Sequence, residues 1–288
     1  PKIPKWLLDR WKKNWPNDYL NFIKCIQDIH PHIDIAVKNN VSKWQKELDA
    51  ELMPNNVLRL SESGLISDKK GYDTGEWWVQ DYSSQLPVKC LTIGQDDEIL
   101  DLCAAPGGKT AQMLALGAKV HSIDLSDKRI IRFKENMRRL KFNPVIDNAD
   151  ILTYKTEKKW QKILLDVPCS STGTIRKNPD ILYSKNEKSV SNLVNLQTRL
   201  LEKSWSLLGK NGHLIYCNCS LEVEEGEMQI INFLKHHGDC QIDKISSNLI
   251  EDIQDSVTEE GWLRILPSGK KGVKNRDGFF IARLKKIS

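Results

Sequence analysis

The sequence predicts an α/β protein with a doubly wound, mostly parallel β-sheet and a small α+β subdomain in front of it. From about residue 97, short apolar runs alternate with stretches of helical length, which is the pattern of consecutive β-α-β units. Several of these runs end in an acid, a cysteine or a glycine turn, as strands do where a sheet binds its ligand. Residues 1–90 lack this alternation, so we expect two domains, 1–90 and 91–288.

The small subdomain is expected to combine tryptophan-rich helices with short strands. Three tryptophans and two leucines recur at roughly helical spacing within residues 3–15. The predicted helices are 3–15, 19–29 and 41–52, and the predicted strands are 32–37, 57–60 and 77–79.

The large domain is expected to continue as regular β-α-β units from its first strand. Ser126 is placed to cap the helix after the second strand, and Gly209 with Gly212 marks the end of the longest helix. The last two strands are expected to close the sheet as an antiparallel pair. The predicted strands are 99–103, 119–124, 145–150, 162–167, 213–219, 241–245 and 279–285, and the predicted helices are 107–116, 126–140, 187–208 and 223–236.

Composition indicates an ordinary globular protein of 288 residues, with a net charge of +5 that is compatible with a polyanionic partner. No apolar run reaches the roughly 18 residues that span a bilayer, and the first residues lack a signal-peptide core. We therefore expect a cytoplasmic, monomeric protein without a membrane partner. The seven cysteines include no CxxC pair, which argues against disulfides and against a metal site. Because the chain starts without Met, we expect it to be part of a longer protein.

The turn after strand 99–103 indicates a nucleotide ligand. Gly107 and Gly108 let the backbone approach a ligand, and the helix that follows offers free N–H groups. A Walker loop would need a glycine five residues before Gly108, where this chain has Cys103, and the dinucleotide pattern G-x-G-x-x-G is absent. A plain tight turn would explain the glycines alone, but not the acid at the end of the next strand.

That acid, Asp124, is placed to accept hydrogen bonds from the two ribose hydroxyls of a nucleoside. Asp150, at the end of the third strand, is expected near an adenine amino group. S-adenosylmethionine fits such an adenosyl site, with Lys109 and Asp166 near its amino acid end. The expected cofactor-binding residues are Cys103, Ala104, Ala105, Pro106, Gly107, Gly108, Lys109, Asp124, Arg129, Asp150 and Asp166.

Two cysteines follow neighbouring predicted strands, Cys169 after 162–167 and Cys219 at the end of 213–219, and the carboxylate of Asp166 accompanies them. An ionised thiol at the carboxyl edge of a sheet can attack an electron-poor ring carbon. Cys217 and Cys103 are expected to serve packing, although Cys103 also lies in the predicted cofactor loop. The remaining three cysteines have no reactive neighbours in the sequence and are expected to be structural.

Three motifs resemble those of the RNA cytosine-5 methyltransferases of the NOL/NOP/Sun family. They are DLCAAPGGKT at 101–110, LDVPCSSTG at 165–173, and YCNCS at 216–220 followed by two glutamates at 224–225. The likeness extends to the bacterial small-subunit ribosomal RNA branch, whose members carry a NusB-like N-terminal domain. We expect this sequence to be the catalytic portion without that domain. Asn218 and Gly226 stand where the family usually has Thr and Asn.

The resemblance implies a Rossmann-like, seven-stranded methyltransferase that uses S-adenosylmethionine to methylate carbon 5 of cytosine in ribosomal RNA. It assigns Cys219 as the nucleophile at carbon 6, Cys169 as the group that aids elimination, and Asp166 as the group that binds ring nitrogen 3, for which Asp166 must hold or share a proton. A DNA cytosine-5 methyltransferase with Cys169 as nucleophile, a catalytically silent RNA-binding factor, and a transfer RNA target remain open alternatives.

A target base inside a duplex cannot reach such a site, so the RNA must be single-stranded or the base flipped. Basic residues occur in three segments, one of them interleaved with the tryptophans of 3–15, and such segments predict a track for phosphates. The resemblance also implies that the small N-terminal subdomain contacts RNA. The expected RNA-binding residues are Arg176, Lys177, Lys271, Lys274 and Arg276.

Overall fold

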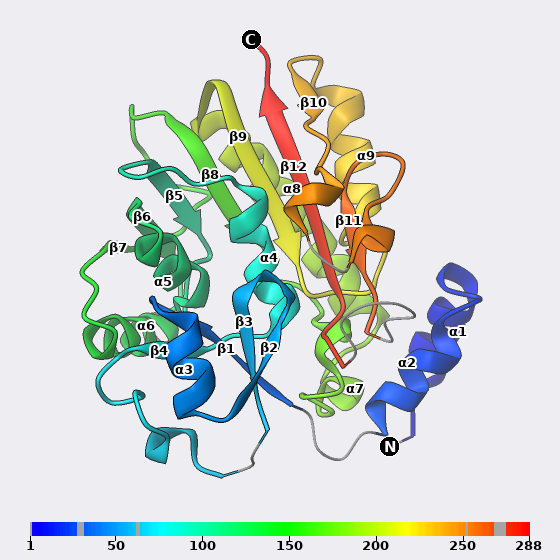
Figure 1. Cartoon of the computed structure of the whole chain (residues 1–288). Helices are drawn as coiled ribbons and strands as arrows, with labels where there is room; N and C mark the ends of the chain where they lie inside the picture. The colour runs from blue at the N-terminus through cyan, green and yellow to red at the C-terminus, as the bar shows by residue number, and fades with distance from the viewer. Residues whose placement is uncertain (1, 28–31, 62–63, 251–252, 268–274) are drawn as a thin grey trace.

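A large β-sheet with the strand order β10-β12-β9-β8-β5-β6-β7 organises the chain (Figure 1). Strands β7, β6, β5, β8 and β9 run parallel, whereas β12 and β10 pair antiparallel at one end, which confirms the predicted sheet. The computed structural model describes residues 2–27, 32–61, 64–250, 253–267 and 275–288. The strands are Glu98–Leu102 (β5), Lys119–Asp124 (β6), Val145–Asn148 (β7), Trp160–Asp166 (β8), Leu208–Asn218 (β9), Cys240–Ile242 (β10) and Phe279–Lys286 (β12).

One strand of this sheet was not predicted from the sequence. β11, Leu263–Ile265, pairs antiparallel with the first residues of β12. It lies off the path of the other seven strands, so the sheet in the described residues has eight strands. Three residues are too few to give a recognisable alternation of apolar and polar positions.

Helices cover both faces of the large sheet, as a doubly wound fold requires. Residues of α4 and α5 share one buried apolar cluster with alternate residues of the central strands, such as Ile99 and Ile215. Residues of α8 and α9 share a second cluster with the intervening positions, such as Leu100 and Leu214. Both faces of these strands are therefore buried, which explains their apolar runs. The helices are Tyr82–Cys90 (α4), Gly108–Ala115 (α5), Asp127–Arg139 (α6), Ile181–Ser184 (α7), Glu187–Leu207 (α8) and Glu227–His236 (α9).

Two predicted helix ends can be compared with the structure. Ser126 caps α6 as predicted, because its side chain accepts a hydrogen bond from the Arg129 N–H. Helix α8 ends at Leu207, but Gly209 and Gly212 do not form its C-terminal cap. The chain passes directly from α8 into β9, and both glycines lie in the first part of that strand, where the register against β8 is irregular. The prediction of a glycine cap was therefore wrong.

The small subdomain is built around a four-stranded antiparallel sheet with the order β2-β3-β1-β4. The predicted helix 41–52 ends early, at Glu47, and its last residues form β2 instead. Asp49 adopts a left-handed backbone conformation with φ +47°, which turns the chain back toward β3. The elements of this subdomain are Ile33–Val37 (β1), Val41–Glu47 (α3), Ala50–Met53 (β2), Val57–Leu60 (β3) and Trp77–Val79 (β4), with short 3₁₀ helices at Pro54–Asn56 and Ile66–Asp68. The 3₁₀ helices Thr172–Thr174, Ser247–Leu249 and Gln254–Ser256 lie in the large domain.

The first two helices, α1 (Lys5–Asn14) and α2 (Tyr19–Ile26), lie beside α7 and apart from the small sheet (Figure 1). Leu7 and Trp11 share a buried apolar cluster with residues of α7 and of the loops that follow β8 and β9. The end of the predicted helix 19–29 lies outside the described residues. Helix α4, just before the predicted domain boundary, packs on the large sheet. None of the helices in the described ranges is long and apolar enough to cross a bilayer.

Candidate active site

The site lies where three neighbouring parallel strands end. β5 ends at Leu102, β8 at Asp166 and β9 at Asn218, and the register pairs Asp166 with Cys217. Because the strands are parallel, their carboxyl ends meet at one edge, and the loops that follow them must also meet there. The three motifs singled out in the sequence are those loops.

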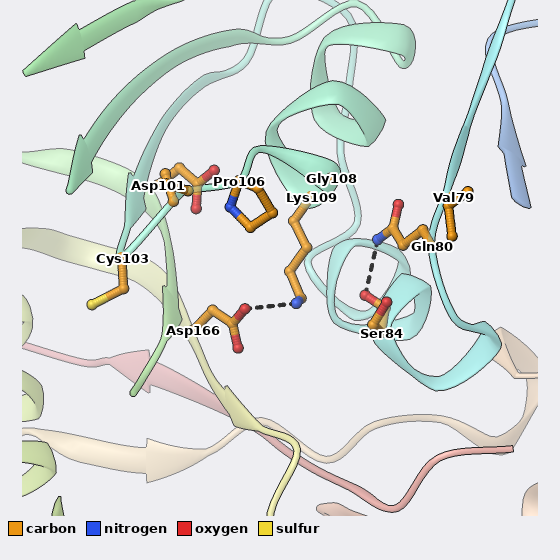
Figure 2. A pocket seen from close by; sticks show the side chains of 11 residues that line it. Val79, Gln80, Ser84, Asp101, Cys103, Pro106, Gly108, Lys109 and Asp166 are labelled. Carbon is orange, nitrogen blue, oxygen red and sulfur yellow. Dashed lines mark hydrogen bonds and ion pairs between the residues drawn. The ribbon is translucent and has the colours of Figure 1, made fainter. Parts of the chain in front are cut away.

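A cavity of about 180 Å³ opens at this edge (Figure 2). One wall is the turn that joins β5 to α5, and the opposite wall comes from the end of β4 and the first turn of α4. Side chains from 101–109 therefore face side chains from 79–84 across the space. The lining residues are Val79, Gln80, Ser84, Asp101, Cys103, Ala104, Ala105, Pro106, Gly108, Lys109 and Asp166.

An ion pair between Lys109 and Asp166 spans the floor of this cavity, with 2.7 Å between Nζ and Oδ2. The same ammonium group lies 5.3 Å from the centre of the Phe279 ring. Burial on its own would lower the pKa of Lys109, but the Asp166 carboxylate outweighs it and the pKa is raised. The cavity therefore contains a cation that keeps its charge at every physiological pH.

The thiols of Cys169 and Cys219 contact each other, with 3.5 Å between the two Sγ atoms. Both cysteines are free, and the separation is well above the roughly 2.05 Å of a disulfide bond. The pKa of Cys169 is raised well above its ordinary range, first by the contact with the Cys219 thiol and then by burial. The sequence prediction that these two thiols meet at one sheet edge is confirmed.

Cys217 is buried in the apolar cluster on one face of the sheet, as predicted. Its Sγ also lies 3.6 Å from Oδ1 of Asp166, a contact that the sequence did not indicate. Burial, followed by the Asp166 charge, raises the pKa of Cys217 well above its ordinary range. The thiol is therefore neutral and can act as a weak hydrogen-bond donor to Asp166.

Asp124 and Arg129 brace the turn between β5 and α5. The buried Asp124 carboxylate accepts hydrogen bonds from the N–H groups of Ala105 and Ser126, both at 3.0 Å. The Arg129 guanidinium lies 3.4 Å from the same carboxylate and donates to the Ala105 carbonyl. Asp150 follows β7 and accepts from the Leu152 N–H. Asp124 thus ends β6 as predicted, whereas Asp150 lies just beyond β7, which ends at Asn148.

The turn itself leaves no room for larger residues. Gly107 has φ +99°, and a Cβ there would lie 2.8 Å from atoms of Phe133 and Met137. The chain can therefore bend this closely over the first turn of α5 only with glycine at this position. A glycine turn, a strand-end acid and an adjoining cavity together fit the adenosyl ligand that the sequence predicts.

Comparison with known proteins decides between the families that use such a site. A family model described as 16S rRNA methyltransferase RsmB/F matches residues 88–285. The chain belongs to this RsmB/F methyltransferase family. It is 33% identical over 297 residues to ribosomal RNA small subunit methyltransferase B of Erwinia tasmaniensis and 34% identical over 296 residues to that of Cronobacter sakazakii. Each alignment covers 98% of this chain, which spans about two thirds (66%) of the length of these relatives.

Solved structures share the fold of this chain. The crystal structure of the protein PH0851 superimposes with a TM-score of 0.90 at 28% identity, covering 99% of this chain and 66% of that one. NSun6 from Pyrococcus horikoshii superimposes with a TM-score of 0.84 at 18% identity, covering 99% and 98% of the two chains. The second likeness, at this low identity, concerns the fold.

Of the five predicted RNA-binding residues of this RsmB/F chain, the three that lie in the described ranges are buried or partly buried. Arg176 is buried and pairs with Asp277 at 3.1 Å and with Asp81 at 3.8 Å. Lys177 is partly buried against the same two carboxylates. The expectation of a basic loop open to phosphates at 176–177 is therefore corrected: the guanidinium is used inside the protein, because two nearby carboxylates need a cation.

The second basic segment gives a similar result where it is described. Arg276 is buried, and its Nε donates to the Leu266 carbonyl at 3.2 Å. Burial lowers the pKa of Arg276. Lys271 and Lys274 lie outside the described residues. Across the described residues, no cluster of three or more His, Cys, Asp or Glu side chains is arranged to hold a metal ion.

Asn218 and Gly226, where this chain departs from the usual family pattern, have specific partners. Asn218 accepts from the Ser220 N–H at 2.9 Å and donates to the Glu225 carbonyl at 2.8 Å. A Cβ at Gly226 would lie 2.4 Å from Nη2 of Arg264, and Arg264 donates to the Ser220 carbonyl at 2.6 Å. Asn218 therefore holds the turn that carries Cys219, and Gly226 leaves the space that Arg264 occupies.

Sequence reasoning missed the polar residues that support the site. Gln80 lines the cavity and donates to the Ser84 carbonyl and to Gln112. Glu225 is buried between the two cysteine loops. The pair of glutamates at 224–225 was noticed only as part of a family motif, and nothing local shows which of the two turns inward.

Proposed function

We propose that this protein methylates carbon 5 of cytosine in ribosomal RNA, using S-adenosylmethionine and a transient bond between Cys219 and carbon 6 of the base. The observation that carries the proposal is the pair of thiols 3.5 Å apart beside the Lys109–Asp166 ion pair, in a chain of the RsmB/F methyltransferase family. Small-subunit ribosomal RNA is the proposed substrate because the matched relatives are named for it. The cytoplasm, where ribosomes are made in bacteria, is the proposed location.

The residues of the cofactor turn would hold S-adenosylmethionine, which supplies an electrophilic methyl group when bound. Asp124 stands at the end of β6 to receive the ribose hydroxyls, and the turn at 103–109 lies against the adjoining cavity. Asp150, after β7, is the proposed partner of the adenine amino group. Lys109 and Asp166 lie at the far side of the turn, toward the thiols.

Cys219 is the proposed nucleophile. Carbon 5 of cytosine becomes reactive when a thiolate adds to carbon 6, because the addition breaks the aromaticity of the ring.

Cys169, whose raised pKa keeps it protonated in the free protein, can donate a hydrogen bond to the Cys219 sulfur across 3.5 Å. Asp166 is proposed to bind ring nitrogen 3 and to stabilise the adduct. After methyl transfer, the carbon 5 proton must leave and the bond between Sγ and carbon 6 must break.

The same contact suits Cys169 to this last step. The largest cause of its raised pKa is the neighbouring Cys219 thiol. Because its sulfur lies beside the sulfur that bonds to carbon 6, Cys169 is the proposed group that takes the carbon 5 proton as that bond breaks.

Separate replacement of the two cysteines tests this assignment. We expect Cys219→Ala to abolish the covalent complex with RNA, and Cys169→Ala to let it accumulate because release is blocked. The complex is measured by its retarded migration in a denaturing gel after incubation with S-adenosylmethionine and RNA. The reverse pattern, with no complex in Cys169→Ala, would assign the nucleophile to Cys169, as in a DNA cytosine-5 methyltransferase.

Transfer of labelled methyl groups tests the substrate. We expect incorporation into unmodified small-subunit ribosomal RNA, followed by mapping of 5-methylcytosine to defined positions. Incorporation only into transfer RNA would replace the proposed substrate, and cofactor binding without any incorporation would indicate a silent RNA-binding factor.

A further inference from the structure

Glu225 is a fully buried acid that lies outside the reacting groups, in the loop between β9 and α9. Its Oε1 accepts from the Ser170 N–H and from Nε2 of Gln197, both at 2.9 Å. Its Oε2 accepts from the hydroxyls of Ser220, at 2.5 Å, and Ser170. Four donors thus converge on one carboxylate.

Two of these donors, Ser170 and Ser220, connect the Glu225 carboxylate to the two reactive cysteines. Ser170 directly follows Cys169, and Ser220 directly follows Cys219. Their hydroxyl oxygens also lie 2.9 Å from each other. The carboxylate therefore joins the two loops at positions one residue away from each thiol.

Glu225 is itself fixed to the large sheet. Its backbone carbonyl accepts from the Tyr216 hydroxyl at 2.7 Å and from Nδ2 of Asn218 at 2.8 Å, so strand β9 sets its position. Gln197, on α8, also donates to the Pro168 carbonyl at 2.9 Å. The cluster is anchored on a strand and on a helix, which are more rigid supports than the two loops.

The negative charge of the Glu225 carboxylate opposes any separation of the two cysteine loops. Within the described part of the chain, no lysine or arginine is paired with the Glu225 carboxylate, so hydrogen bonds from the two loops and from Gln197 stabilise it. A buried carboxylate without such donors is strongly unfavourable, and the donors would in turn be left without an acceptor. Moving the loop of Cys169 away would break two of these bonds, and moving Ser220 away would break one of them together with the contact between the two serine hydroxyls.

We propose that Glu225 is a positioning residue that holds the Cys169 and Cys219 thiols at their working separation. The inference rests on the function proposed above, because a reaction that uses the two sulfur atoms in turn needs them at one fixed separation. Glu225 acts through Ser170 and Ser220 and does not touch the base.

The separation of the thiols can be measured without any RNA. Diamide oxidises two adjacent thiols to a disulfide: the thiols lose two electrons and two protons, and diamide takes them up to become a hydrazine. We expect Glu225→Gln, which keeps the shape but replaces an acceptor oxygen with an NH₂ group, to slow formation of the Cys169–Cys219 disulfide by about tenfold or more. Peptide mass mapping identifies the pair that forms.

Methyl transfer gives a second, independent reading. In Glu225→Gln we expect kcat for RNA methylation to fall by about tenfold or more, whereas Kd for S-adenosylmethionine changes less than twofold because the cofactor turn is not part of the cluster. Glu224→Gln is the matched control. Glu224 is the adjacent acid, but it pairs with Arg10 at 2.7 Å instead of the serines, so both rates should stay within twofold of wild type.

The outcomes separate this inference from the proposed function. A folded Glu225→Gln variant with wild-type disulfide and methylation rates overturns the inference. A slowed disulfide in a protein that methylates no RNA supports the positioning role and contradicts the proposed function. If Glu225→Gln does not fold, Ser170→Ala and Ser220→Ala each remove one hydroxyl donor. Slower disulfide formation in both supports the inference, and wild-type rates in both overturn it.

Discussion

Asp101, in the wall of the cavity, is buried and hydrogen-bonded to the Thr110 hydroxyl. Burial raises its pKa to about 7, opposed by the hydrogen bond to Thr110 and assisted by the charge of Asp166. Its proton is therefore held more tightly in the folded protein than in the unfolded chain. The contribution of this proton to the stability of the folded protein is complete below the pKa of Asp101 in the unfolded chain, near 3.8. It is lost as the pH rises toward about 7, the pKa in the folded protein.

We expect Asp101→Asn to weaken the dependence of the free energy of unfolding on pH in this range. Between pH 4 and 8 the free energy of unfolding of the wild type should fall relative to the variant, by a difference on the order of 2–4 kcal/mol. Urea unfolding of both proteins at several pH values measures the difference. Parallel profiles would show that Asp101 releases its proton at the same pH in the folded and unfolded chains.

Gly226 has no space for a side chain beside Arg264 and Phe280. We expect Gly226→Asn, which introduces the residue usual in the family, to lower the free energy of unfolding by about 1–3 kcal/mol and to displace Arg264 from the Ser220 carbonyl. Gly238→Asn is the control, because a Cβ at Gly238 meets nothing within 4 Å. Equal stability of the two variants in thermal unfolding would contradict this expectation.

A site residue could be predicted from the sequence when its position is set by the strand next to it in the chain. Cys169, Cys219 and Asp166 were placed together because each follows a recognisable buried strand, and parallel strands present their ends at one edge. Arg176 was misplaced because its environment is set by Asp277, which is 101 residues away. The sequence shows a charge but does not show whether a distant partner will bury it.

The elements of the large domain could be predicted because each of them leaves a pattern in its own stretch of sequence. Parallel strands with both faces buried appear as short apolar runs, and the helices between them repeat with their own period. Strand β2 was mistaken for the end of a helix because no sequence signal marks the left-handed conformation of Asp49. The docking of α1 was not predicted either, because helical periodicity reveals an apolar face but not the surface that it will cover.

Helix α1 is held on the loop of the nucleophile by a partly buried ion pair, which joins Arg10 Nε to Glu222 at 2.5 Å. We expect Arg10→Ala to reduce the hydrogen-exchange protection of α1 and α2 by on the order of 1–3 kcal/mol, since Glu222 loses the partner of its buried charge. Protection in the large sheet should not change. Lys5→Ala, which removes an exposed pair with Asp9, serves as the control. Unchanged protection in Arg10→Ala would mean that apolar packing alone docks the helix.

At the scale of the whole molecule, the excess of positive charge is small, so RNA binding must depend on where the lysines lie. We expect replacement of both Lys271 and Lys274 by Ala to reduce the slope of log affinity against log salt by about 1–1.5, the value for two phosphate contacts on a single strand. Filter binding at several salt concentrations measures the slope.

Lys158→Ala provides the comparison for this experiment. Lys158 pairs with Glu98 at the start of β5, at the end of the sheet opposite the proposed active site, so its loss should leave the slope unchanged. If Lys158→Ala and the double variant have equal slopes, the proposed RNA contact at 271 and 274 is excluded.

The contact between α1 and the loop after β9 also has a consequence during synthesis on the ribosome. Arg10 and Glu222 are 212 residues apart, so at 5–20 residues per second the helix emerges roughly 10–40 seconds before its partner. During that interval the apolar side chains of Leu7, Trp11 and Phe22 lack the surface that they cover in the finished fold. The helix pair therefore docks only after this loop has been made, and until then its apolar side chains have no partner surface.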